Sequence, residues 1–303
     1  MPLAGRTARL NRPHRHSRES GNLALFFRWV PAFAGMTKGE VTRYERPMTP
    51  PDIIPTALAY FDPGDGRRIA YRYRAPASGG PTVLFLSGYA SDMEGTKAEA
   101  IDAFCATRGI GCLRLDYSGT GASGGDFADG TLTRWLEEVL AAIDLLSEGP
   151  LIIAGSSMGG WLALHAALRR PQRVKGVLGI AAAPDFTDWD FVQEEVDTLR
   201  RDGKLERANP YGPEPSVTWR GFWESGSAHR LLYNPIDLII PVRLVHGEQD
   251  EEVPMGVPIK LMADLRSSDV QLRLVKGAGH RLSEPHEIHA ILTELHGLVE
   301  RIA

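Results

Sequence analysis

The sequence has little cysteine, no long apolar run and no excess of positive charge, and each absence excludes a class of protein. Its 303 residues contain two cysteines, Cys105 and Cys112, which cannot form a disulfide framework. No apolar stretch reaches the roughly 18 residues of a membrane span, so no transmembrane segment is expected. A balance of 34 basic against 38 acidic residues gives no signal for nucleic-acid binding. No group of His and Cys has metal-ligand spacing, so we expect neither a metal nor an organic cofactor.

The first 38 residues differ in composition from the remainder of the chain. They hold seven basic residues and one acidic residue, whereas the rest holds 27 basic and 37 acidic residues. Three interpretations compete: a secretory signal with Leu23–Phe27 as its interrupted apolar core, an Arg-rich transit peptide, and a translated intergenic segment upstream of a true start at Met48. We favour the third. Residues 1–50 are therefore expected to be an unstructured or mis-assigned extension, residues 51–303 to form the domain, and the protein to be cytoplasmic.

Strand-like and helix-like segments alternate along the rest of the chain. The expected strands are 57–61, 67–74, 83–86, 112–115, 151–154, 174–181, 242–246 and 272–275, and the expected helices are 97–108, 132–146, 158–170 and 285–301. Short continuous apolar runs are typical of strands buried on both faces of a parallel sheet. The pattern predicts an α/β fold, with a mostly parallel central sheet and helices on both faces. Residues 185–235, rich in aromatic and charged side chains, interrupt the alternation and are expected to form a cap insertion.

A candidate nucleophile stands at the turn from an apolar strand to a helix. Gly155-Ser156-Ser157-Met158-Gly159 matches the G-x-S-x-G nucleophile elbow. The turn is so tight that glycine is needed two residues before and two residues after the serine, and this frame selects Ser157 over Ser156. The N-terminus of the following helix favours negative charge beside the serine. The alternative is a glycine-rich turn with an incidental serine.

A nucleophilic serine needs an imidazole to take its proton and a carboxylate to orient the imidazole. Asp250 follows the strand 242–246 at the carboxyl end, where the active edge of a parallel sheet lies, and Glu248 is its rival. His280 follows the last strand through a glycine-rich loop. His246 and His165 are interpreted as core or supporting residues. Ser, then Asp, then His is the chain order expected for an elbow serine.

Acyl transfer also needs two N–H donors for the oxyanion. One is expected from the backbone of Met158, next to the nucleophile. The other is expected from the loop 86–92 after an early strand, where Gly88 lets the backbone turn and Tyr89 supplies the N–H group. An ordinary strand–helix loop remains the alternative. A second glycine-rich loop, 116–123, is interpreted as a structural turn beside the pocket.

Several stretches together resemble the α/β-hydrolase superfamily. They are Gly88–Ala98, Asp116–Gly121, Gly155–Leu162, His246–Asp250 and His280-Arg281. Within that superfamily, the chain is most similar to a mitochondrial group. The members of this group hydrolyse palmitoyl-protein thioesters and acyl-glucuronide esters. The resemblance runs from about residue 56 to the end and implies Ser157, Asp250 and His280 as a catalytic triad. It is looser across residues 185–235, so it implies the triad and the oxyanion loop but not the substrate.

The sequence thus predicts a serine hydrolase that cleaves acyl thioesters or esters through an acyl-enzyme. The substrate is expected to be a small molecule or an acylated protein, and no nucleic-acid partner is expected. A general carboxylesterase or acyl-glucuronide esterase uses the same triad and stays open, as does an acyltransferase. A non-catalytic binding module is the remote alternative. The oligomeric state is not indicated.

Overall fold

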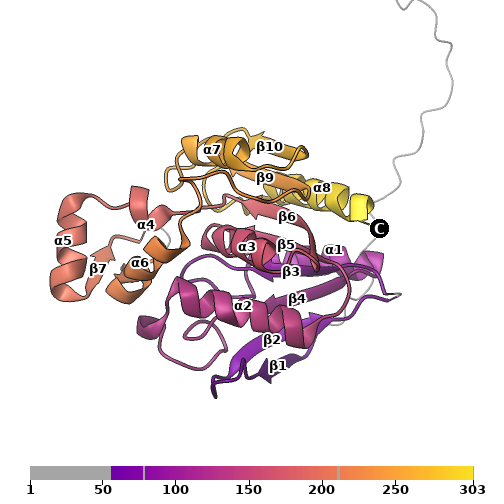
Figure 1. Ribbon diagram of the computed structural model, residues 1–303, viewed down its shortest axis with the longest axis horizontal. Helices are drawn as coiled ribbons and strands as arrows, with labels where there is room; N and C mark the ends of the chain where they lie inside the picture. Colours follow the sequence, from indigo (N-terminus) through magenta and orange to yellow (C-terminus); the bar gives the residue numbers. More distant parts are fainter. Residues whose placement is uncertain (1–55, 78, 210–211, 303) are drawn as a thin grey trace, which may run out of the picture. The chain divides into compact units, whose positions relative to one another are not determined.

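The computed structural model describes residues 56–77, 79–209 and 212–302 (Figure 1). The predicted N-terminal extension, residues 1–50, lies outside the described residues. The described residues belong to the unit Thr49–Ala303.

An eight-stranded sheet forms the centre of the fold. Its strands are β1 (Leu58–Phe61), β2 (Ile69–Arg74), β3 (Thr82–Leu86), β4 (Gly111–Leu115), β5 (Leu151–Ser156), β6 (Val174–Ile180), β9 (Val242–Gly247) and β10 (Val270–Val275). The spatial order is β1-β2-β4-β3-β5-β6-β9-β10, with antiparallel pairing at β1–β2 and β2–β4 and parallel pairing elsewhere. The prediction of a mostly parallel sheet is confirmed.

Helices cover both faces of this sheet. They are α1 (Thr96–Arg108), α2 (Leu132–Leu146), α3 (Met158–Arg169), α7 (Gly256–Asp264) and α8 (Pro285–Ile302). Alternate residues of β3 enter two separate cores: Leu84 and Leu86 pack with α2 and α3, whereas Val83 and Phe85 pack with α1 and α8. Helix α7 was not predicted, because a glycine and a proline stand in its first turn. No helix within the described ranges combines the length and apolarity needed to cross a bilayer.

The segment between β6 and β9 departs from the strand–helix alternation. It contains α4 (Phe186–Trp189), α5 (Gln193–Asp202), β7 (Lys204–Arg207), β8 (Ser216–Trp219), α6 (Arg220–Gly226) and the 3-10 turn η2 (Ser227–His229). Strands β7 and β8 pair with each other in a separate antiparallel sheet, and α4, α5, β7 and α6 group together beyond one end of the main sheet (Figure 1). We call residues 185–235 the insertion.

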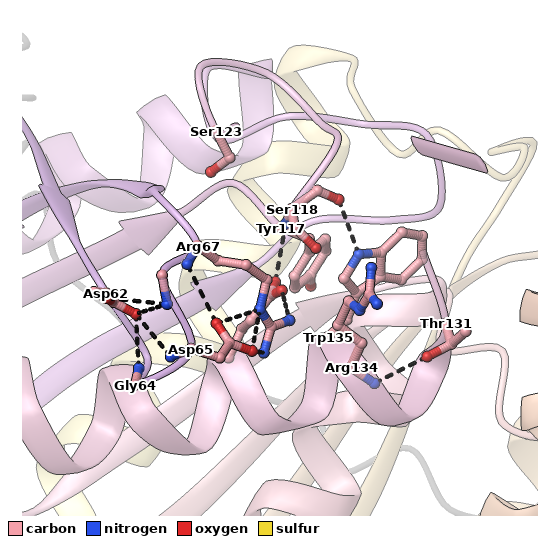
Figure 2. A network of polar contacts seen from close by, with 12 residues as sticks. Asp62, Gly64, Asp65, Arg67, Tyr117, Ser118, Ser123, Thr131, Arg134 and Trp135 are labelled. Carbon is pink, nitrogen blue, oxygen red and sulfur yellow. Dashed lines mark hydrogen bonds and ion pairs between the residues drawn. The ribbon is translucent and has the colours of Figure 1, made fainter. Parts of the chain in front are cut away.

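Hydrogen bonds hold the loop after β4 against helix α2 (Figure 2). The Trp135 indole donates to the carbonyl of Ser118 at 3.1 Å, and the Ser118 N–H donates to Glu138 at 2.9 Å. The Glu138 side chain is fully buried and pairs with Arg67, whose guanidinium also binds Asp65. Burial raises the pKa of Glu138 despite these partners. Since a buried carboxylate is costly without its partners, the network fixes this loop at the carboxyl edge of the sheet.

Candidate active site

The residues predicted for the triad and the oxyanion donors lie beyond the carboxyl ends of parallel strands. Tyr89 follows β3, Ser157 follows β5, Asp250 follows β9 and His280 follows β10. The carboxyl ends of parallel strands share one edge of the sheet. The topology therefore brings together side chains that are far apart in the sequence.

Ser157 has an unusual backbone conformation. Its φ is 54° and its ψ is −119°, a combination that L-residues rarely adopt. Three hydrogen bonds hold it: its N–H donates to Ile180 at 2.9 Å, and its carbonyl accepts from Gly160 at 2.9 Å and Ala183 at 3.1 Å. Strain of this kind persists only when the surroundings determine the conformation.

The glycines of the motif are required by close backbone contacts. A Cβ atom on Gly155 would lie 2.2 Å from the carbonyl oxygen of Gly159, and a Cβ on Gly159 would lie 2.2 Å from that of Leu86. Gly88 also lies beside the turn, at ordinary contact distance, since a Cβ there would lie 3.4 Å from the Cβ of Ser157. The loop after β3 thus runs directly beside the serine.

A line of hydrogen bonds joins Ser157, His280 and Asp250. The Ser157 Oγ lies 3.1 Å from His280 Nε2, and His280 Nδ1 lies 2.9 Å from Asp250 Oδ2. Asp250 Oδ1 accepts from the backbone N–H groups of Glu252 at 3.0 Å and Val253 at 2.8 Å. The His280 side chain is 13% exposed and the Asp250 side chain 1% exposed. In this arrangement an imidazole is held on one side and faces a hydroxyl on the other.

The electrostatics of Asp250 favour its ionised form. Burial by itself raises the pKa of this carboxyl, but the hydrogen bond and charge of His280 and the Val253 N–H outweigh burial and leave the pKa below its usual value. The rival acid Glu248 is exposed and points elsewhere, since it accepts from Lys276 at 2.6 Å and from the Gly277 N–H at 3.1 Å. Of Asp250 and Glu248, only Asp250 therefore lies within hydrogen-bond distance of the His280 ring.

The two residues expected to supply the oxyanion donors lie near Ser157 in the chain or in the fold: Met158 follows it directly, and Tyr89 follows Gly88, where a Cβ would lie 3.4 Å from the Ser157 Cβ. Met158 is the first residue of α3, where N–H groups have no partner within the helix. The Tyr89 ring packs 4.5 Å from Phe222 of the insertion, centroid to centroid, and its hydroxyl donates to the carbonyl of Val217 at 3.0 Å. Burial raises the pKa of Tyr89 well above its usual value, so the hydroxyl stays a donor. The loop after β3 is therefore fastened to the insertion.

A buried carboxylate ties this loop to the glycine-rich loop after β4. Asp116 accepts from the backbone N–H groups of Met93 and Ala122, each at 2.8 Å. Gly121 leaves room for it, since a Cβ there would lie 2.1 Å from the carboxylate. The two loops border a pocket of about 240 Å³, lined by Ala90, Ser91, Asp92, Gly119, Thr120, Gly121 and Phe127.

Three further residues lie beside the triad, and the sequence indicated only one of them, His246, as a core or supporting residue. Glu252, two residues after Asp250, has its Oε2 3.8 Å from His280 Nε2. His246 is 1% exposed; its Nε2 lies 3.0 Å from the Val253 carbonyl and 3.5 Å from Asp250 Oδ2. Lys97 contacts the residue after His280. Lys97 and Glu252 have no signal in the sequence, because only the folded sheet edge brings them to the loop that holds His280. His246, by contrast, stands four residues before Asp250.

The described part of the chain contains no cluster of three His, Cys, Asp or Glu side chains suited to a metal ion. His165, eight residues into α3, is buried and hydrogen-bonds the carbonyl of His229 at 2.8 Å, in keeping with its interpretation as a structural residue. The site thus consists of a serine, an imidazole, a carboxylate and backbone amides.

Comparison with known proteins agrees with the predicted resemblance. Residues 83–291 match the model of the alpha/beta hydrolase family. The mitochondrial palmitoyl-protein thioesterase ABHD10 of Pongo abelii is 36% identical over 252 residues, which cover 82% of this chain and 82% of the relative.

Two solved structures of hydrolases resemble the fold of this chain. A protein of Agrobacterium vitis S4 assigned as a hydrolase is 40% identical and superposes with a TM-score of 0.76, covering 80% of this chain and 98% of its own. The mouse alpha/beta hydrolase domain-containing protein 10 is 33% identical with a TM-score of 0.76, covering 82% and 100%. The predicted resemblance is confirmed.

The expectation of a cytoplasmic protein is contradicted by these relatives. ABHD10 of Pongo abelii, of human and of three further mammals is named a mitochondrial protein. The expectation depended on setting aside residues 1–50, although an Arg-rich and acid-poor segment is also the composition of a transit peptide. With that correction, the family match, the relatives and the superposed structures lead to one conclusion: this chain belongs to the alpha/beta hydrolase family and is a hydrolytic enzyme.

Proposed function

We propose that the protein is a serine hydrolase that cleaves acyl thioesters or esters through a Ser157–His280–Asp250 triad. The observation that carries the proposal is the unbroken hydrogen-bond line from Asp250 Oδ2 through both ring nitrogens of His280 to Ser157 Oγ. Serine at the strained elbow is a weak nucleophile until an adjacent base removes its proton.

In the first step Ser157 Oγ attacks the carbonyl carbon of the substrate while its proton passes to His280 Nε2. The charged Asp250 holds the ring so that Nδ1 carries a proton and Nε2 accepts one, and it stabilises the imidazolium that forms. The carbon–sulfur or carbon–oxygen bond then breaks, and His280 returns the proton to the leaving thiol or alcohol. Water, activated by the same nitrogen, releases the acid from Ser157.

The tetrahedral oxyanion is stabilised by the backbone N–H groups of Met158 and Tyr89. The contacts of Gly159 with the Leu86 carbonyl and of Gly88 with Ser157 support this assignment, because they place the loop after β3 next to the elbow. Donors fixed in advance cost no reorganisation when charge develops, and each is worth about 10²–10³ in kcat.

The relatives suggest the substrate. ABHD10 is named a palmitoyl-protein thioesterase, and we propose an acyl thioester as the preferred substrate here. The insertion acts as the cap: the buried Phe222 packs it against Tyr89, and the half-buried Phe186 beside Tyr89 offers apolar surface to an acyl chain.

A second candidate is a carboxylesterase for oxygen esters with short acyl groups. It would use the same residues, because Ser157 attacks the carbonyl carbon of an oxygen ester and of a thioester through the same acyl-enzyme.

The experiment compares a palmitoyl thioester with the matched palmitoyl and butyryl oxygen esters. Ser157→Ala is the inactive variant and Ser156→Ala, at the neighbouring serine, is the matched control. A thioester preference lost only in Ser157→Ala supports the first candidate. Faster hydrolysis of the butyryl ester favours the second. Undiminished hydrolysis by Ser157→Ala contradicts both.

A further inference from the structure

Lys97 connects helix α1 to the loop that carries His280. It stands in the first turn of α1 and its ammonium group donates a hydrogen bond to the backbone carbonyl of Arg281, 184 residues away. Arg281 follows His280 directly. The carbonyl that Lys97 binds belongs to the peptide unit between Arg281 and Leu282.

The same peptide unit leads into a strained residue. Leu282 has a φ of +45° although it is not glycine, a conformation that a leucine side chain disfavours. Leu282 is 1% exposed and buried in the core that α1 and α8 share. The loop is thus anchored by the buried Leu282 after the peptide unit and by Lys97 on its carbonyl.

Three charged side chains influence the protonation of Lys97, and two of them, Glu252 and Arg281, also lie next to His280. Glu252, whose Oε2 lies 3.8 Å from His280 Nε2, and Glu287 of α8 favour the ammonium form, whereas Arg281 opposes it. Burial is the largest influence and lowers the pKa of Lys97 to about 8. An ammonium donor makes a stronger hydrogen bond than a neutral amine, so the anchor weakens as Lys97 loses its proton.

We propose that Lys97 is a positioning residue for the hydrolytic reaction: by holding the Arg281 carbonyl it keeps His280 Nε2 directed at Ser157. The inference rests on the proposed function of Ser157 and His280. It concerns a residue that touches neither the substrate nor the reacting atoms. Its effect is therefore expected in kcat rather than in substrate binding.

The test compares Lys97→Met, which removes the donor, with Lys97→Arg, which keeps a charged donor. Lys276→Met is the matched control. Lys276 stands close before His280 in the sequence, but it pairs with Glu248 on the surface. We expect Lys97→Met to lower kcat about tenfold with KM changed less than about twofold. Lys97→Arg should recover most of the loss, and Lys276→Met should match the parent enzyme. Equal rates in Lys97→Met and Lys276→Met would overturn the inference.

The pH dependence of kcat separates positioning from a loss of stability. In the parent enzyme kcat should fall as the pH rises through about 8, toward the level of Lys97→Met. Lys97→Arg should lack this alkaline decrease, because arginine stays protonated. This comparison remains decisive if Lys97→Met does not fold, since an unchanged alkaline decrease in Lys97→Arg would overturn the inference. Hydrolysis that survives Ser157→Ala would instead overturn the proposed function, and the role of Lys97 with it.

Discussion

Replacing Asp250 with asparagine should nearly abolish hydrolysis while leaving the fold intact. Asparagine keeps an oxygen for the Glu252 and Val253 N–H groups, but its amide would face His280 Nδ1 where Oδ2 now lies 2.9 Å away. The amide donates a hydrogen bond, so Nδ1 must become the acceptor and the ring proton moves to Nε2. Nε2 then faces Ser157 with a proton already bound and cannot remove another.

The expected loss is about 10⁴-fold in kcat, the size found when this carboxylate becomes an amide in a serine triad. The free energy of unfolding should fall by less than about 3 kcal/mol, the scale of one charged hydrogen bond. Steady-state hydrolysis and urea unfolding measure the two effects. Glu248→Gln, at the exposed rival acid, should retain kcat within about twofold. A loss below tenfold in Asp250→Asn, or an equal loss in Glu248→Gln, would refute the assignment of Asp250.

Three further predictions concern the elbow, a buried histidine and the link to the insertion. Gly155→Ala should abolish activity and lower the yield of folded protein, because its Cβ would lie 2.2 Å from a backbone oxygen; Gly297→Ala, in open space on α8, should stabilise by about 0.5–1 kcal/mol in urea unfolding. Burial lowers the pKa of His165 from 6.5 to about 4, so on acidification the unfolded chain binds a proton before the folded protein does. The free energy of unfolding is therefore highest above pH 6.5 and decreases as the pH falls toward 4. His165→Gln should reduce this decrease, measured by urea unfolding, by up to about 3 kcal/mol. Tyr89→Phe removes the hydrogen bond to Val217 and should lower the thermal midpoint by about 2–4 °C; an equal shift in Tyr233→Phe, at an exposed hydroxyl bound to Asp188 within the insertion, would contradict this role.

The centre of the main sheet could be predicted from the sequence because β3 and β5 are continuous apolar runs and helices α2 and α8 have clear apolar stripes. Helix α2, for example, has the predicted bounds, 132–146. The position of Ser157, Asp250 and His280 at one edge follows from parallel pairing, so their proximity was predictable as well. The insertion was predicted as a cap, but its strands β7 and β8 were not, because each has four residues and only Leu205 among them is buried.

Contacts that depend on loop conformation could not be predicted. Lys97 meets Arg281, and Glu252 approaches His280, only after β9, β10 and α1 have come together. Neither pair has a spacing or composition that distinguishes it from solvated charges. The sequence therefore indicates which residues could perform the chemistry, whereas the supporting contacts need the fold.

The central claim is that Ser157 becomes acylated. The direct measurement is peptide mass spectrometry of the enzyme mixed with a palmitoyl thioester and quenched in acid within the first turnover, with Ser157→Ala and Ser156→Ala treated alike. The account predicts a palmitoyl adduct on Ser157 in the parent enzyme and in Ser156→Ala, and none in Ser157→Ala. An adduct on another residue, or one that persists in Ser157→Ala, would contradict it.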